Sequence, residues 1–191
     1  MQRTKHGPEW SFAADLSVSR TWGHGMKAGV WLAISLALSM VTPTDRADTY
    51  LGARWDADAV VVTMRDHRQL VVAKDAEQVG LEQAAVSSDQ SAVGWLATYP
   101  NCCTSYPVPL KLMVFSGGQL RVFAPNELPV WYWAFRNGSR EVCYQQETVH
   151  GGFGVRHELR EVTTGKLLAH FEPQQGIPKP AWVQELEASR H

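Results

Sequence analysis

Two adjacent cysteines are the residues of this chain best suited to covalent or metal chemistry. Cys102 and Cys103 lie in the segment YPNCCTSYPVP, residues 99–109. A thiolate acts as a nucleophile when a base lies within hydrogen-bonding reach, and the candidate base is His150, in the segment QETVHGGFGVR at 146–156. The sequence offers no specific third group to orient that base, so a catalytic pair is the less favoured interpretation.

A metal site is the second possibility for the same residues. Thiolates bind soft Cu(I), and a ligand set for this ion would consist of Cys102, Cys103, His150 and His157. Adjacent cysteines are poorly spaced for tetrahedral zinc, whose cysteine ligands usually have at least two residues between them. No Met-rich or His-rich tract accompanies the pair, and we expect no cofactor.

A disulfide is the third possibility, and the one that the sequence favours in an oxidising compartment. Cys143 is the remaining cysteine of the chain. A bridge from it to Cys102 or Cys103 would close about 40 residues and stabilise the fold by roughly 3–4 kcal/mol. The alternatives are a small, buried, reduced Cys143 and a strained bond between Cys102 and Cys103 themselves.

The amino-terminal part of the sequence indicates export. Met26 and Lys27 precede an uncharged, apolar run at 28–41, and a polar stretch follows it. This order is typical of a secretory signal peptide, whereas a membrane-spanning helix needs about 20 apolar residues. We expect a disordered or misassigned extension at 1–25, a signal peptide at 26–47 and a periplasmic or secreted bacterial protein. A membrane anchor or a buried helix is the alternative.

The charge of the chain excludes one class of partner. Its 18 basic and 19 acidic residues nearly cancel, and no basic run provides the clustered positive face that nucleic acids require. The expected partner is therefore a protein or a small-molecule ligand. Once the signal is cleaved, the chain is not expected to be embedded in a membrane.

The elements that position these residues are predicted to be β-strands. Within an expected domain at 48–171, short runs rich in β-branched and aromatic residues alternate with Gly, Asn, Asp and Ser over 58–171, at the spacing of hairpins. Almost no helical period interrupts them. The sequence therefore predicts a single all-β domain.

An internal repeat organises the strands. Two pairs of segments match without a gap, in the same order and at nearly the same spacing: 86–95 with 135–144, and 112–120 with 159–167. Such a pattern indicates stacked copies of one unit, and chance similarity among hairpins is the alternative. With a half-copy upstream, we expect a hairpin at 58–76 and then two antiparallel four-stranded meanders in tandem, at 79–124 and 129–171.

The first copy resembles a known repeat. In VSSDQSAVGW, the residues Ser87, Asp89, Val93 and Trp95 occupy positions of the turn motif WSPDG…IAF of TolB-like β-propellers. The resemblance covers about two blades, residues 79–171, and implies four-stranded blades. Because propellers have at least four blades, the chain would form an incomplete propeller or a sandwich, or complete itself as an oligomer. Propellers host many activities, so the resemblance implies no particular function.

A Pro-rich linker and a short helix are expected at the end of the sequence, over 172–191. The linker EPQQGIPKP is followed by AWVQELEASRH, which places Trp182, Val183 and Leu186 on one helical face. We expect this helix to fold back and cover an edge strand.

The expected site lies on the two longest loops, 99–109 and 146–156. They are equivalent in the repeat, so they should emerge on the same side of the domain, and function often resides on such loops. The expected ligand-binding residues are Tyr106, His150, Gly151, Gly152 and Phe153. For the two glycines, a backbone that needs positive φ is the alternative explanation.

The sequence thus predicts an exported, non-catalytic binding or interaction module that uses these two loops. The alternative is a small metal- or thiol-dependent exported enzyme, or a metal carrier, that uses Cys102, Cys103 and His150.

Overall fold

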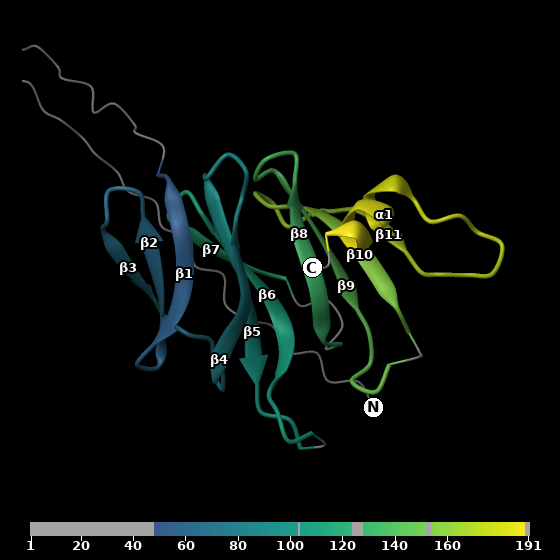
Figure 1. The fold of residues 1–191 in the computed structure, drawn as a ribbon, viewed down its shortest axis with the longest axis horizontal. Helices are drawn as coiled ribbons and strands as arrows, with labels where there is room; N and C mark the ends of the chain where they lie inside the picture. The colour runs from purple at the N-terminus through teal and green to yellow at the C-terminus, as the bar shows by residue number, and fades with distance from the viewer. Residues whose placement is uncertain (1–47, 103, 124–127, 152–153, 190–191) are drawn as a thin grey trace, which may run out of the picture. The chain divides into compact units, whose positions relative to one another are not determined.

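Three antiparallel sheets and one short helix make up the described part of the chain (Figure 1). The computed structural model describes residues 48–102, 104–123, 128–151 and 154–189. Sheet A contains β1 (Tyr50–Asp56), β2 (Ala59–Met64) and β3 (Gln69–Val72). Sheet B contains β4 (Gly80–Val86), β5 (Ala92–Tyr99), β6 (Val108–Ser116) and β7 (Gln119–Phe123). Sheet C contains β8 (Val130–Arg136), β9 (Glu141–Gln146), β10 (Arg156–Glu161) and β11 (Leu167–Phe171), and the helix α1 spans Ala181–Ala188.

The prediction of an all-β fold with tandem meanders is confirmed. Within each sheet the strands pair in chain order, and the meanders expected at 79–124 and 129–171 are sheets B and C. The hairpin expected at 58–76 is β2 with β3, but β1 pairs with β2 in front of it. The expectation of a lone hairpin was therefore wrong, because the sequence of β1, YLGARWD, alternates too weakly to be recognised as a strand.

The segments expected as an extension and a signal peptide, 1–25 and 26–47, lie outside the described residues. In the part that the structure describes, no helix is long and apolar enough to cross a membrane. Export therefore stays a prediction.

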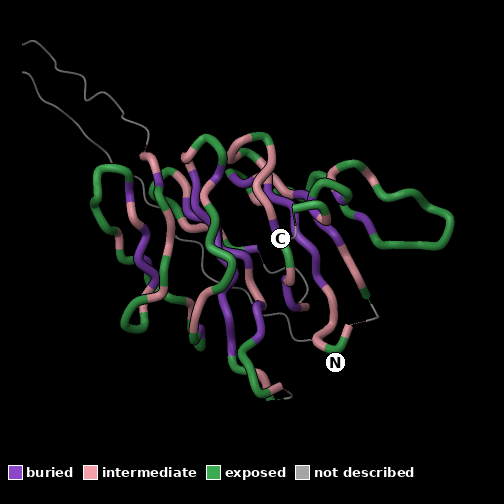
Figure 2. The backbone as a smooth tube through the Cα atoms, viewed as in Figure 1, coloured by how far each residue is buried: buried purple, intermediate pink, exposed green. Residues whose placement is uncertain are grey.

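Buried side chains fill the space between successive sheets. The cluster between sheets A and B includes Tyr50, Val62, Trp95, Met113 and Phe115. The cluster between sheets B and C includes Leu96, Val114, Trp133, Val142 and Tyr144. Every residue of β5 is buried, and since side chains alternate along a strand, Trp95 faces one neighbouring sheet and Leu96 the other. Sheet B is thus a middle layer, with buried backbone along its central strands (Figure 2).

A glycine allows sheets B and C to approach closely. A Cβ atom added to Gly94 would lie 2.6 Å from Cη2 of Trp133 and 3.2 Å from the carbonyl oxygen of Met113. The Trp133 indole is held over this position because its Nε1 donates a hydrogen bond to the carbonyl oxygen of Gln83, at 3.1 Å. The large ring fills the core here only because β5 presents no side chain.

The helix α1 covers the other face of sheet C. Its Leu186 packs against Cys143 and Leu159, and Glu185 forms an ion pair with Arg136, at 2.8 Å. Val183 and Leu186 are buried, and the helix folds back over β9 and the edge strand β8. In the repeat, Cys143 corresponds to Gly94. Gly94 of sheet B faces sheet C, and Cys143 of sheet C faces α1. The helix therefore packs on sheet C in the way that sheet C packs on sheet B.

Candidate functional site

A hydrogen-bonded clamp, formed by Asp89, Ser91 and Ser139, joins the β4–β5 turn to the β8–β9 turn. Oδ2 of Asp89 accepts hydrogen bonds from the backbone N–H of Ser139 at 3.1 Å and from its hydroxyl at 2.9 Å. The hydroxyls of Ser91 and Ser139 lie 2.5 Å apart. These two turns are the ones that match in the repeat, so equivalent turns of sheets B and C lie side by side.

The clamp requires Asp89 to be ionised. Its Oδ1 also accepts from the Ser87 hydroxyl at 2.6 Å and from the Ser91 backbone N–H at 3.1 Å. Partial desolvation by the neighbouring turn would raise the pKa of Asp89, which is still exposed, but the hydrogen bonds from Ser87, Ser91 and Ser139 outweigh it and hold the pKa well below its usual range. An ionised carboxylate has only acceptor sites, so it can accept all four of these hydrogen bonds. A protonated carboxyl group carries a donor and could not accept all four.

The position of the clamp also shows at which end of the sheets the two long loops lie. Strands β5 and β9 both begin at the clamped turns and run away from them, so loops 99–109 and 146–156 leave the sheets at the opposite edge. We call this end of the sheets, where the strands join the two long loops, the loop edge. The opposite end, which carries the clamp, is the turn edge. Neither name refers to an edge strand. Figure 1 shows both loops at the lower end of their sheets. The structure thus brings the two loops to one edge, as the repeat predicted.

Each described loop segment is held by hydrogen bonds within its own loop. In the first loop, Thr104 donates from its hydroxyl to the carbonyl oxygen of Tyr106 at 2.6 Å, and the Tyr106 side chain is exposed. In the second, Gly151 donates from its backbone N–H to the carbonyl oxygen of Thr148 at 3.0 Å, and His150 is exposed. Gly151 has φ of 70°, so a backbone requirement accounts for it. Cys103, Gly152 and Phe153 lie outside the described residues.

The disulfide expected between Cys143 and the cysteine pair is not formed, and this prediction was wrong. Cys143 is a free thiol, fully buried in β9, and its Sγ lies 3.6 Å from the carbonyl oxygen of Ala134. Burial raises the pKa of this thiol to about 11. Cys143 faces α1, whereas Cys102 is exposed in a loop at the loop edge. The alternative of a small, buried, reduced residue describes Cys143 correctly.

The four-residue metal set proposed from the sequence is also divided by the fold. His157 is buried in β10, and its ring lies 6.1 Å from that of Phe171 and 6.4 Å from that of Trp182, between centroids. It therefore faces the helix and not the loop that carries His150. Among the described residues, no group of three or more His, Cys, Asp or Glu could hold a metal ion. The thiol and metal alternative involves Cys103, which the structure does not describe.

Sequence reasoning missed a buried charge in sheet C. Glu158 has no exposed surface, and its Oε2 accepts hydrogen bonds from the Tyr144 hydroxyl at 2.6 Å and from Arg160 Nε at 2.7 Å. Its Oε1 lies 2.8 Å from Nη2 of Arg156. Burial and then the Glu158 carboxylate raise the pKa of Tyr144. Glu158 is fully buried and lies between Tyr144, Arg156 and Arg160, so it joins β9 to β10 and is out of contact with solvent.

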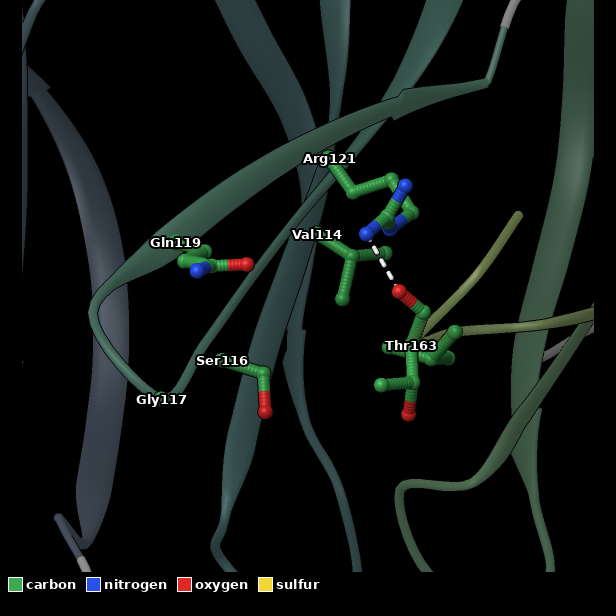
Figure 3. Close-up of a pocket in the computed structure, with 7 residues that line it drawn as sticks. Val114, Ser116, Gly117, Gln119, Arg121 and Thr163 are labelled. Carbon is green, nitrogen blue, oxygen red and sulfur yellow. Dashed lines mark hydrogen bonds between the residues drawn. The ribbon is translucent and has the colours of Figure 1, made fainter. Parts of the chain in front are cut away.

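The sequence also gave no warning of a cavity at the turn edge. This hairpin cavity, of about 300 Å3, lies between the β6–β7 hairpin and the turn that joins β10 to β11; it is lined by Val114, Ser116, Gly117, Gln119, Arg121, Val162 and Thr163 (Figure 3). The two hairpins are equivalent in the repeat. The signal that could have found the cavity is this match, since the clamp shows that equivalent turns lie side by side.

No protein-family model matches the chain, and no curated protein sequence is similar to it. The resemblance to TolB-like repeats stays a prediction.

Proposed function

We propose that the protein is an exported, non-catalytic binding module whose partner, a protein or a small molecule, contacts the loop edge. The observation that carries the proposal is that the two longest connections between strands lie at one edge of adjacent sheets (Figure 1). Loops on a rigid sheet scaffold are the usual place for recognition. The compartment, periplasmic or extracellular, is part of the proposal.

The rigidity of the scaffold supports it. Sheets B and C share a buried core, and the clamp joins them at the turn edge. Strand β6 starts with Val108 paired to Tyr99, and β10 starts with Arg156 paired to Gln146. Both loops therefore begin and end on paired strands, so their positions relative to each other are set by the sheets.

The chemistry of the loop edge suits contact more than catalysis. Tyr106 exposes 52 % of its surface, and an aromatic ring with a hydroxyl provides both apolar contact and a hydrogen bond to a partner. His150 is exposed on the neighbouring loop. A nucleophilic pair needs an oriented base. Among the described residues, no carboxylate forms an ion pair with His150 that would orient its ring.

Site-specific photo-crosslinking tests the proposal. The full chain, expressed in its own cell, would carry p-benzoyl-phenylalanine in place of Tyr106 or of His150, and in place of Thr164 as the control. Thr164 is exposed at the turn edge. We expect adducts of one mass from both loop positions and none from the control. Adducts from Thr164 alone, or from no position, would refute a partner at the loop edge, and sequencing of the mature amino terminus near residue 48 would test export.

A further inference from the structure

The hairpin cavity combines an apolar floor with a single positive charge. Val114 and Val162, both buried, contribute apolar side chains. Ser116 and Gln119 lie on one side, and Arg121 and Thr163 on the other (Figure 3). Arg121 is the charged residue of the lining, and no acidic residue accompanies it there.

Arg121 differs from the other half-buried arginines of the described chain. Arg136, Arg156 and Arg160 each form ion pairs with a glutamate, at 2.8 Å, 2.8 Å and 2.7 Å. Within the described residues Arg121 has no carboxylate partner, and its one hydrogen bond runs from Nη2 to the carbonyl oxygen of Thr163. That bond fixes the plane of the guanidinium and leaves Nε and Nη1 as donors. A partly buried cation without a carboxylate partner is a place where an anion from solution can bind.

We propose that the hairpin cavity binds a small organic carboxylate with an apolar body. The carboxylate accepts a charge-assisted hydrogen bond from an Arg121 N–H that Thr163 does not engage, either Nε or Nη1. The apolar body lies on Val114 and Val162, and the Gln119 amide lies at the rim. One cation and an apolar floor match a monoanion better than a phosphate, which carries more charge and no apolar surface. This site lies at the turn edge and is independent of the proposed partner at the loop edge.

The test uses benzoate as the probe, with benzamide as its neutral analogue and inorganic sulfate as a purely ionic one. Binding to the full chain would be followed by NMR, through the Nε–Hε signal of Arg121 and the amide signals of Gly117 and Val162. The variant Arg121→Gln removes the charge. The control Lys166→Gln removes the same charge from an exposed residue of the adjoining turn that does not line the cavity.

We expect benzoate to shift these signals saturably, and benzamide to leave them unchanged. Arg121→Gln should weaken benzoate binding about tenfold or more, as the loss of hydrogen bonds to a charged group requires, and Lys166→Gln should change it less than twofold. If Arg121→Gln does not fold, Arg121→Lys, which keeps the charge and loses the fixed directions of the guanidinium donors, should weaken binding in the same direction. No saturable shift with benzoate overturns the proposal. Equal binding of benzamide, or binding of sulfate alone, overturns the ligand class.

Discussion

Replacement of Asp89 by asparagine should loosen sheets B and C by breaking the clamp. The carboxylate accepts four hydrogen bonds, two on each oxygen. Asparagine keeps one acceptor and turns an NH2 group toward two donors, so two hydrogen bonds are lost. Each hydrogen bond to a charged acceptor contributes about 1.5–3 kcal/mol when sheltered, and Asp89 is exposed. We therefore expect a loss of about 2 kcal/mol at pH 7 in total, or about 4–8 °C in Tm.

The same substitution should change how stability depends on pH. The pKa of Asp89 is lower in the folded than in the unfolded state, so the folded chain holds fewer protons on this group in acid. Its contribution is complete above the unfolded pKa of about 3.9 and declines as the pH falls below that value. The difference between the wild type and Asp89→Asn should accordingly be smaller at pH 3 than at pH 7.

Urea unfolding followed by tryptophan fluorescence measures both effects. The matched control is Asp56→Asn, whose carboxylate pairs with Arg54 on the surface, with side chains 46 % and 52 % exposed; it should cost less than about 0.5 kcal/mol. A loss for Asp89→Asn no larger than that of the control at pH 7 would show that the clamp does not hold the sheets together. A difference that is the same at pH 3 would show that the ionised carboxylate is not its source.

Three further substitutions or reactions test the packing. Gly94→Ala should lose about 1–3 kcal/mol, because its Cβ would overlap Trp133, whereas Gly52→Ala, with nothing within 4 Å of its Cβ, should change the unfolding free energy by less than about 0.5 kcal/mol. The Cys143 thiol, buried and with its pKa raised to about 11, should react with a disulfide reagent at pH 8 only as fast as the chain unfolds; rapid reaction of the peptide that contains it would contradict its burial. Tyr144→Phe should lose about 1–3 kcal/mol, because it removes a donor from the buried Glu158 carboxylate; a neutral result in thermal melts would mean that the carboxylate is satisfied without it.

The sequence predicted the features that depend on neighbouring residues. Strand alternation and turn residues are local signals, and the ungapped repeat located sheets B and C to within a residue or two. It also implied that the equivalent long loops would emerge on the same side, and the contact between Asp89 and Ser139 across 50 residues aligns the two sheets in the way that this requires. The amphipathic spacing of Val183 and Leu186 predicted the helix for the same reason.

Features that depend on how sheets pack could not be predicted in this way. The environment of Cys143 is set by which face of β9 meets α1. The spacing of cysteines along the chain does not give the distance between them in the folded protein. The partners of Glu158 follow from the register of β9 and β10, in which Tyr144 lies opposite it. The hairpin cavity is lined by residues of two hairpins that are far apart in the sequence and meet only in the folded chain. Of the expected loop residues, Tyr106 and His150 are exposed where the repeat placed their loops, and their role in binding stays a prediction.

The position of α1 has a consequence for assembly. Sheet C lies on sheet B through a heterologous interface, so a chain built from this repeat has no inherent length limit, and its last sheet would offer the face with Cys143 and Leu159 to the first sheet of another molecule. An eight-residue helix takes that place, with Glu185 engaged by Arg136. Unlike a further sheet, the helix offers no edge strand with unpaired backbone groups to another molecule. The helix therefore covers the face of sheet C on which a further sheet of the repeat would stack.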